Sequence, residues 1–479
     1  MCVGPETGPP TVARDDLLQD FDVLGYPASL VVDHRDTVGP RASPKRSRPT
    51  QECTLVHTTE FPTNPVSDSG GTDPIGEPGL GRRRGVATEE VRRHNLGAVL
   101  ERIHFSGSLS RSELTTMTGL NRSTVADLLG ELTSLGLVEE RPGLSASGPG
   151  RPSPLVKSRP EGATVLAVDL AVDSIAVATL GLGGHLYNQV RVARPRGRFS
   201  PEETVQDVAK LAGPLLDSLP TKHTLAGIGV SVVGITRRSD GFVHLAPNLG
   251  WRDVPLAAML AAEIDLGVPV LAANDADLGA LAEHRRGLRP GIGDLIYVAG
   301  EFGIGAGVIV DGRPLRGAAG YAGEAGHTLI NPDGLACRCG AIGCWETEAG
   351  EVALLRHAGL TVGAGRVDEI AELAAVGDEP TLQAIAEIGR WLGYGIGNLI
   401  NIFNPDLVIL GGLYQRLFTY LEPSVVEGAG RRTLLPPGEL ATIARSSLGP
   451  DAPLVGAAEL VLSGVIADPA GANGRSAVG

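Results

Sequence analysis

A histidine and three cysteines lie within eighteen consecutive residues, in the stretch "HTLINPDGLACRCGAIGC". The chain of 479 residues has only five cysteines, and His327, Cys337, Cys339 and Cys344 are separated by nine, one and four residues. One imidazole and three thiolates form a donor set that suits tetrahedral Zn²⁺. A disulfide between Cys337 and Cys339 would close a strained ring, and three thiols leave one unpaired in any pairing. The spacing predicts a structural zinc site with these four ligands, which leaves no position open for an activated water.

Two glutamates bracket this cluster. Glu324 precedes His327 by three residues, and Glu346 follows Cys344 by two. Either glutamate taken alone is more often a solvated surface residue. A metal that fixes the loop also fixes both carboxylates, which are good acceptors for the hydroxyl groups of a sugar.

The charge of the chain is unevenly distributed. The formal net charge is −14, yet between Arg82 and Pro160 twelve Lys or Arg stand against eight Asp or Glu, which leaves −18 on the remainder. Non-specific binding of nucleic acid by the whole acidic molecule is therefore not expected. The distribution predicts a small basic module attached to a large acidic one.

The sequence shows no secretion or membrane signal. Glycines, prolines or charges interrupt every hydrophobic run before the roughly 18 apolar residues that a membrane helix needs. The first residues lack a basic segment followed by an apolar run, and the cysteines are not spread as in a disulfide scaffold. We expect a cytoplasmic protein without a membrane partner.

Changes in sequence texture divide the chain into four parts. Residues 1–84 mix Pro, Gly, Ser, Thr and charges without a sustained period and are expected to be a disordered arm. Residues 85–160 predict short helices followed by a Gly/Pro/Ser-rich hairpin. Residues 161–467 alternate apolar strands with Ala/Leu-rich helices, which is typical of an α/β domain. Residues 468–479 are expected to be a disordered tail.

One pattern occurs twice in the α/β part. "TVLAVDLAVDSIAVATLGLGGHL" and "DLIYVAGEFGIGAGVIVDGRPL" both predict two apolar strands joined by a tight turn, and they begin about 130 residues apart. Hairpins are common, so coincidence is the competing explanation. The repeat favours two related lobes with a cleft between them.

The basic module has the punctuation of a helix-turn-helix. Ser110 can cap a helix that runs through Glu113 to Met117, Gly119 makes the turn, and Asn121 can cap a second helix with Val125, Leu128, Leu129 and Leu132 on its apolar face. The following "GLVEERPGLSASGPGRPSP" fits a β-wing whose Gly-Arg-Pro tip suits a minor groove. A helical hairpin used for dimerisation is the alternative. On the DNA-binding interpretation, the contact residues are Arg111, Asn121, Arg122, Ser123, Thr124 and Arg151.

With these motifs together, the chain resembles the ROK family of repressors, open reading frames and sugar kinases. "GYAGEAGH" followed by "CRCGAIGCWE" is similar to the zinc signature of that family, and "NLGWRDVPL", "ANDADLGALAE" and "INIFNPDLVILGG" are similar to its ligand-side segments. The resemblance covers residues from about 88 to 466. It implies a winged helix-turn-helix followed by a two-lobed, actin-like (ribonuclease H-like) α/β domain.

The resemblance also implies a sugar site between the lobes. Its hydroxyl-binding positions match Asn248, Asn274, Asp275, Glu324, His327 and Glu346. In the kinases of the family, the aspartate at the position of Asp275 is the general base. Without the motif, an aspartate before "ADLGALAE" would more often be a helix cap.

The chain departs from the kinase pattern where ATP phosphates would bind. The kinases carry Asp-x-Gly-Gly-Thr in the first hairpin turn, whereas this chain has Asp169, Leu170, Ala171, Val172 and Asp173. In the second hairpin Glu301 and Phe302 replace a Gly-Thr pair before Gly303. Phosphate binding needs close backbone N–H groups and a hydroxyl donor, so we expect no bound ATP and no enzyme activity.

These observations predict a regulator of carbohydrate uptake or metabolism genes. We expect a repressor that binds a DNA operator as a homodimer or homotetramer and responds to a sugar or phosphosugar in the cleft. One alternative is an ATP-dependent, glucokinase-like sugar kinase with an accessory DNA-binding domain. Another is a DNA-binding protein whose cleft binds no sugar.

Overall fold

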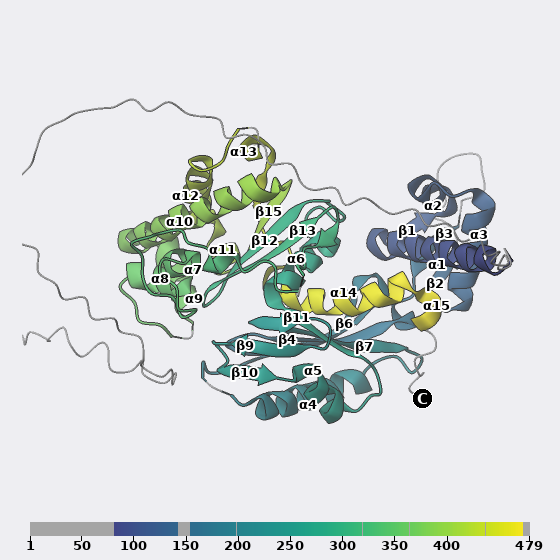
Figure 1. The fold of residues 1–479 in the computed structure, drawn as a ribbon. Helices are drawn as coiled ribbons and strands as arrows, with labels where there is room; N and C mark the ends of the chain where they lie inside the picture. Colours follow the sequence, from purple (N-terminus) through teal and green to yellow (C-terminus); the bar gives the residue numbers. More distant parts are fainter. Residues whose placement is uncertain are drawn as a thin grey trace, which may run out of the picture. The chain divides into compact units, whose positions relative to one another are not determined.

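The computed structural model describes residues 81–141 and 154–472, apart from the single residues 198, 319, 364 and 436 (Figure 1). The expected arm up to residue 80, the wing tip with Arg151 and the tail from residue 473 lie outside the described residues. Within the boundaries that we expected for the arm and the tail, residues 81–84 belong to a helix, and Pro469–Ala472 form the short helix α15.

The N-terminal module contains three helices and a small antiparallel sheet. The helices are α1 (Gly81–Ser106), α2 (Arg111–Thr118) and α3 (Arg122–Ser134), and the strands are β1 (Ser108–Ser110), β2 (Val138–Arg141) and β3 (Leu155–Ser158), in the order β1-β3-β2. The predicted caps are confirmed: Ser110 forms a capping box with Glu113, and the Asn121 side chain accepts from the amide of Thr124. Gly119 ends α2 with φ 69°, a left-handed conformation that glycine adopts without strain. Helix α1, with 26 residues, is much longer than the short helices expected.

The first lobe is built on a five-stranded sheet. Its strands are β4 (Thr164–Leu170), β5 (Ser174–Gly181), β6 (His185–Ala193), β7 (Leu225–Val232) and β11 (Val270–Asn274), in the order β11-β7-β4-β5-β6. A second, three-stranded sheet comprises β8 (Ile235–Arg237), β9 (Phe242–Ala246) and β10 (Trp251–Val254). The helices of this lobe are α4 (Pro201–Asp217) and α5 (Leu256–Ile264), with short 3₁₀ turns η1 (Pro160–Gly162) and η2 (Leu182–Gly184).

The second lobe has its own five-stranded sheet. Its strands are β12 (Leu295–Gly300), β13 (Ile304–Val310), β14 (Arg313–Pro314), β15 (Leu407–Gly412) and β16 (Thr442–Arg445), in the order β14-β13-β12-β15-β16. Its helices are α7 (Trp345–Ala349), α8 (Glu351–His357), α9 (Arg366–Ala375), α10 (Glu379–Phe403), α11 (Leu413–Arg416), α12 (Phe418–Gly430) and α13 (Pro437–Leu440). It also contains the 3₁₀ turns η3 (Ala325–His327) and η4 (Gly449–Asp451).

The two five-stranded sheets have the same topology. In each sheet a hairpin is extended by a third antiparallel strand on one side, and by two parallel strands on the other. Two unrelated hairpins would not be expected to continue in the same way. The duplication predicted from the repeated hairpin pattern is therefore confirmed.

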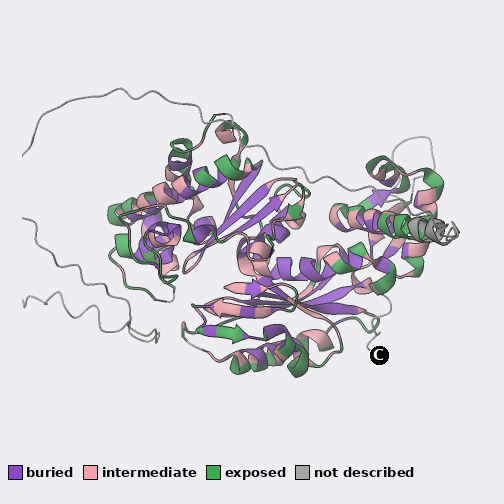
Figure 2. Ribbon diagram, viewed as in Figure 1, coloured by how far each residue is buried: buried purple, intermediate pink, exposed green. Residues whose placement is uncertain are grey.

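Two helices join the lobes. Helix α6 (Asp275–Arg286) leads from the first sheet to the second and packs on β12 and β13, and α14 (Ala452–Ala467) returns the chain and packs on β4 and β7. The two helices also pack against each other (Figure 1). The segment Gly449–Ala467 is apolar and long enough to cross a membrane by composition, with 61% of it buried. Its packing between the sheets accounts for that composition, and Figure 2 shows the helix largely buried.

The N-terminal module shares a hydrophobic core with the first lobe. Buried side chains of α1 and α3, among them Leu100, Ile103 and Leu129, join one continuous cluster with Val165 of β4 and Leu462 of α14. The helices approach closely at Gly97 of α1, where a Cβ atom would lie 2.6 Å from the carbonyl oxygen of Ile466 in α14. The module is thus packed on the lobe that follows it.

Candidate functional site

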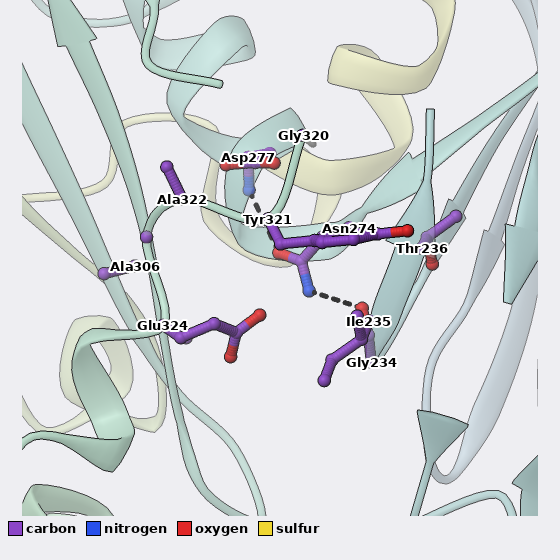
Figure 3. Close-up of a pocket in the computed structure, with 12 residues that line it drawn as sticks. Gly234, Ile235, Thr236, Asn274, Asp277, Ala306, Gly320, Tyr321, Ala322 and Glu324 are labelled. Atoms are coloured by element: carbon purple, nitrogen blue, oxygen red, sulfur yellow. Dashed lines mark hydrogen bonds between the residues drawn. The ribbon is translucent and has the colours of Figure 1, made fainter. Parts of the chain in front are cut away.

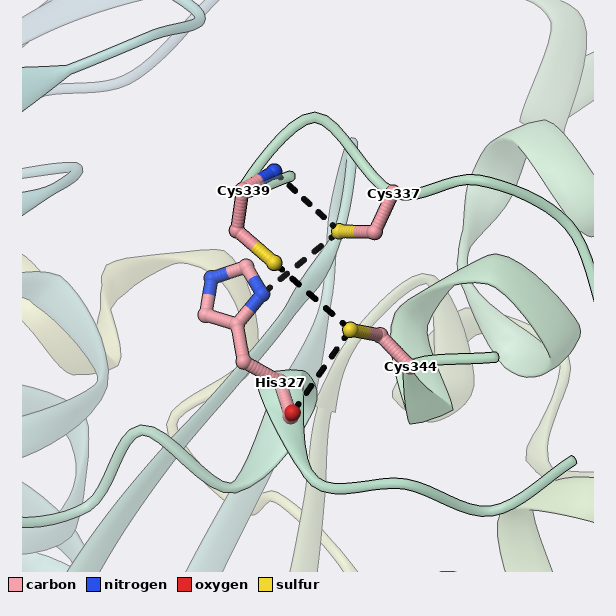
Figure 4. Close-up of side chains that lie close together, drawn as sticks. All are labelled: His327, Cys337, Cys339 and Cys344. Atoms are coloured by element: carbon pink, nitrogen blue, oxygen red, sulfur yellow. Dashed lines mark hydrogen bonds between the residues drawn. The ribbon is translucent and has the colours of Figure 1, made fainter. Parts of the chain in front are cut away.

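The predicted zinc ligands lie together (Figure 4). One donor atom from each of His327, Cys337, Cys339 and Cys344 lies within 4.8 Å of all the others. The Sγ atoms of Cys339 and Cys344 are 3.6 Å apart, and Cys337 Sγ is 3.7 Å from His327 Nδ1. Metal bonds of about 2.0–2.3 Å in a tetrahedron place its ligand atoms about 3.5–3.8 Å apart. These two separations match that geometry, and the cluster could hold a metal ion.

Local backbone geometry positions this cluster. An isolated β-bridge between Leu329 and Cys344 closes the loop at its base, and a second one between Ala336 and Ile342 closes the tip that carries Cys337 and Cys339. Cys344 is the N-terminal cap residue of α7. Burial raises the pKa of the Cys337 thiol, so the thiolate form is unfavourable without a metal. A bound cation would stabilise the thiolate.

The N-terminus of α6 lines a pocket between the two lobes (Figure 3). The pocket has a volume of about 360 Å³ and receives Asn274 and Asp277 from the start of α6 and Thr236 from β8. Tyr321 and Glu324 come from the loop before η3. The Asn274 side chain accepts from the amides of Ala276 and Asp277 and donates to the carbonyl of Gly234. Asn274 is thus the cap of α6, while Asp275 is the first residue of the helix.

Acidic side chains gather around this helix start. Burial, Asp169 and Glu324 raise the pKa of Asp275 to about 7, and burial also raises the pKa of Asp277 to about 7, although Arg238 opposes that shift. The pKa of Glu301 is raised by burial and by Asp275. Carboxyl groups whose ionised form is unfavourable thus surround the N-terminal end of α6. Hydroxyl donors from a ligand would stabilise the ionised form.

The structure does not bring all six predicted sugar residues to the pocket. Asn274 and Glu324 line it, and Glu324 contributes to the raised pKa of Asp275. The Glu346 Oε1 atom lies 3.0 Å from Cys337 Sγ and 3.8 Å from His327 Nδ1, beside the metal cluster. Asn248 is joined to the same loop because its Oδ1 accepts from Arg338 at 3.1 Å.

Three pocket residues with polar side chains escaped the sequence analysis. Thr236 is 5% exposed, and its Oγ1 has no hydrogen-bond partner among the described residues, so it is free to bind a ligand hydroxyl. Asp277 lies two residues after Asp275. Because it falls in the first turn of the helix that Asn274 caps, the sequence could have predicted that it lies near the Asn-Asp pair. Tyr321 presents an aromatic side chain in the pocket (Figure 3). Thr236 and Tyr321 carried no such signal.

The loops that differ from the kinase pattern form a set of contacts between the lobes. The Arg196 guanidinium donates to Glu351 of α8 at 2.8 and 3.1 Å and lies 3.4 Å from the Asp173 carboxylate. The guanidinium groups of Arg196 and Arg338 lie 5.3 and 4.9 Å from the centre of the Phe302 ring. Asp173 and Phe302 therefore have protein partners in this structure.

Of the predicted DNA-contact residues that the structure describes, some have exposed side chains without a protein partner, and others are already bonded within the protein. Arg122 and Ser123 are exposed at the start of α3, and Arg122 has no ion-pair partner among the described residues. The Asn121 Oδ1 is occupied as a cap because it accepts from Thr124 N and Ser123 Oγ. Arg111 pairs with Glu140 of β2 and so ties α2 to the small sheet.

Comparison with known proteins agrees with this architecture. Residues 165–463 match the model of the ROK family. The chain is 32% identical to the xylose repressor of Bacillus subtilis (strain 168) over 374 residues, 78% of this chain and 96% of that repressor. It is 30% identical to the glucokinase of Streptomyces coelicolor over 316 residues, 62% of this chain and 96% of that enzyme. A solved ROK family transcriptional regulator, described as a homologue of the E. coli MLC protein, matches with a TM-score of 0.65 at 24% identity, over 79% of this chain and 97% of that one.

The resemblance inferred from the zinc signature and the ligand-side segments is confirmed by the family match, which covers more than half of the chain, and by solved structures that share the mixed α/β fold. The chain belongs to the ROK family.

Proposed function

We propose that this protein is a sugar-responsive transcriptional repressor of carbohydrate uptake or metabolism genes. The observation that carries the proposal is the extent of the similarity to a repressor. The match to the B. subtilis xylose repressor covers 374 residues, whereas the family model matches only residues 165–463. Only 16 residues follow position 463. Most of the additional matched residues therefore precede residue 165, in the N-terminal module. The glucokinase match has about the length of the family domain.

The N-terminal module is assigned to operator binding as a winged helix-turn-helix. Its basic charge, the exposed first turn of α3 and the β2–β3 pair support this assignment. Arg122, Ser123 and Thr124 would read the major groove, Arg151 a minor groove, and Arg111 and Asn121 would support the helices that position them. Two-fold operators suit a homodimer or homotetramer, and binding to the genome places the protein in the cytoplasm.

The cleft is assigned to a sugar. The Thr, Asn, Asp and Glu side chains that line the pocket offer hydrogen-bond partners suited to the hydroxyl groups of a monosaccharide. Asn248, Asn274, Asp275, Glu324, His327 and Glu346 would bind its hydroxyls, together with Thr236 and Asp277. Arg238 and Arg316 act electrostatically on Asp277 and would be available to a phosphosugar. Xylose is the first probe because the relative is named for it.

The cysteine cluster is assigned to structural Zn²⁺. His327, Cys337, Cys339 and Cys344 would hold the ion, and its role would be to fix the loop between Glu324 and Glu346. His327 Nδ1 faces the cluster, so its other ring nitrogen is left for a sugar hydroxyl. The ion supplies rigidity to the sugar site rather than a reactive water.

An ATP-dependent sugar kinase is the second candidate, because a glucokinase matches over almost its full length. Asp275 would be its general base, as the family resemblance implies. The first phosphate turn speaks against it. Asp173 adds a negative charge there, and Arg196 binds that carboxylate and Glu351 together.

Fluorescence anisotropy on zinc-loaded protein tests the repressor. DNA fragments upstream of its own gene and its neighbours are titrated at fixed salt, with and without xylose, glucose and their phosphates. Specific binding that one of these compounds alters supports the proposal. Sugar-dependent ADP release that disappears in Asp275→Asn would establish the kinase instead, and no fragment bound better than random DNA would remove the operator role.

A further inference from the structure

The C-terminal end of α6 lies in a buried polar junction with the N-terminal module. His104 of α1 is 0% exposed, and its Nε2 lies 3.0 and 3.1 Å from the two carboxylate oxygens of Glu459 in α14. The Nε of Arg286, the last residue of α6, donates to Glu459 at 2.8 Å, and its Nη1 donates to the carbonyl of His104 at 2.9 Å. Three elements that are far apart in the sequence therefore meet at one carboxylate.

The hydrogen bonds fix the protonation of this junction. The amide of Gly183 in η2 donates to His104 Nδ1 at 2.9 Å, so that nitrogen accepts and carries no proton. The proton is then on Nε2, which faces the carboxylate of Glu459 and also contacts the Nη2 of Arg286. Arg285, at 3.4 Å, and Arg286 leave Glu459 as an anion in contact with a neutral histidine and two cations. Each of these hydrogen bonds and ion pairs requires the partner elements to keep their positions, so a small displacement of one element would break contacts at the junction.

The opposite end of α6 lies in the sugar cleft. Asn274 caps it, and Asp275 and Asp277 belong to its first turn. The helix has 12 residues, or about 18 Å at 1.5 Å per residue, and packs along α14. A rigid element thus has one end in the pocket and its other end bonded to α1.

Aromatic and apolar contacts surround the junction. The guanidinium groups of Arg285 and Arg286 lie 5.1 and 5.8 Å from the centre of the Phe105 ring. Arg286 also donates to the carbonyl of Gly183 at 3.2 Å, and the hydrophobic cluster shared by α1 and α14 lies alongside. A shift of α6 would have to repack this contact, because close-packed interiors do not deform continuously.

We propose that α6 carries the sugar signal to the DNA-binding module through the His104–Glu459–Arg286 junction. This inference rests on the proposed function, since it assigns the regulation of the same cleft. A ligand that bonds Asp275 and Asp277 moves the start of α6, and the junction converts that displacement into a change in the position of α1 and the helices packed on it. In this proposal, the arrangement of the junction without ligand and its arrangement with ligand differ in operator affinity.

A ligand-free experiment tests the mechanical link. In protein labelled with ¹³C at histidine Cε1, the His104 signal is assigned by its loss in His104→Gln. Asn274→Ala removes the cap bonds at the cleft end of α6 and is expected to shift or broaden the His104 signal. Ser200→Ala removes the cap of α4, which is bonded to Glu203 N, and is expected to leave that signal in place. A His104 signal that is unmoved in Asn274→Ala, or moved equally by Ser200→Ala, overturns the proposal.

A second experiment measures the coupling with xylose as the probe. The ratio of operator Kd values with and without xylose is compared among wild type, Glu459→Gln and Phe105→Leu, with xylose affinity measured by calorimetry. The typical coupling of about 5- to 150-fold is expected to fall to within about twofold of unity in Glu459→Gln and to an intermediate value in Phe105→Leu, with xylose still bound. Arg93→Ala breaks only the exposed contact of α1 with Asp468 and should retain the wild-type ratio.

The outcomes separate the two proposals. Glu459→Gln and Phe105→Leu with the wild-type ratio would overturn the junction as the route. If Glu459→Gln does not fold, Phe105→Leu decides. If wild type binds no xylose, or if xylose does not change its operator affinity, xylose is not the effector, and the histidine signals then decide on the link.

Discussion

The fold strongly alters the ionisation of the carboxyl groups at the start of α6. Asp275 and Asp277 are both shifted upward, to pKa values of about 7, because each is buried and faces other acids. A native carboxyl with a raised pKa holds a proton that the unfolded chain has already lost. Between the unfolded value of 3.8 and about 7, stability therefore falls as pH rises. Such destabilisation is expected of a binding site without its ligand.

Replacement of Asp275 by asparagine should therefore stabilise the ligand-free protein at high pH. We expect Asp275→Asn to be more stable than wild type at pH 8 by about 1–4 kcal/mol, and by much less at pH 4, where the wild-type carboxyl is protonated. Thermal melting of both proteins at the two pH values measures this. Glu263→Gln, which removes an exposed acid of α5, is the control. An equal effect of Asp275→Asn at both pH values would show that its ionisation does not limit stability.

The metal ligands make a second prediction at the residue scale. Cys339→Ala should lose the bound zinc and weaken sugar binding about tenfold or more, because Glu324 and Glu346 are no longer held by the loop. Metal analysis and calorimetry check both quantities on one sample, and Cys53→Ala, a thiol outside the cluster, should retain both. Undiminished sugar affinity in metal-free Cys339→Ala would separate the zinc from the sugar site.

Helix α3 carries the prediction for DNA recognition at the element scale. Its first turn presents Arg122 to solvent, while Val125, Leu128, Leu129 and Leu132 are buried, as the sequence predicted. Arg122→Ala should weaken binding to the preferred operator by about 1–3 kcal/mol and binding to random DNA much less, because a base contact discriminates between sequences. Anisotropy on both DNAs measures it, with Arg102→Ala on α1 as control. Equal losses on both DNAs would reduce Arg122 to a phosphate contact.

The contact of α1 with α14 gives a second prediction at this scale. A Cβ on Gly97 would lie 2.6 Å from the Ile466 carbonyl oxygen, so Gly97→Ala should destabilise the protein by about 1–3 kcal/mol. Gly130 in α3 has nothing within 4 Å of its Cβ position, and Gly130→Ala should be neutral or stabilise by up to about 1 kcal/mol. Denaturant unfolding of the two variants compares them. A Gly97→Ala protein as stable as Gly130→Ala would show that the two helices can separate freely.

At the scale of the whole molecule, the sequence correctly predicted those features that depend on residues close together in the chain. The caps of α2 and α3, the metal-ligand spacing and the repeated hairpins involve residues within about twenty positions of one another, and the structure has all of them. The length of α1 was not predicted, because its apolar residues pack on α14, which lies more than 350 residues away. The junction of His104 and Glu459 escaped for the same reason. The pocket role of Thr236 depends on tertiary contacts that its sequence neighbours do not reveal.

The central claim is that one sugar in the cleft changes the affinity of the protein for its operator. The most direct measurement is the operator Kd of zinc-loaded wild type and Asp275→Asn, with and without xylose and the other sugars and phosphosugars. We predict that one compound changes the wild-type Kd at least about fivefold, while Asp275→Asn binds the operator as tightly as ligand-free wild type and does not respond. A wild-type operator Kd that no compound changes, or an Asp275→Asn protein that responds like wild type, would contradict the account.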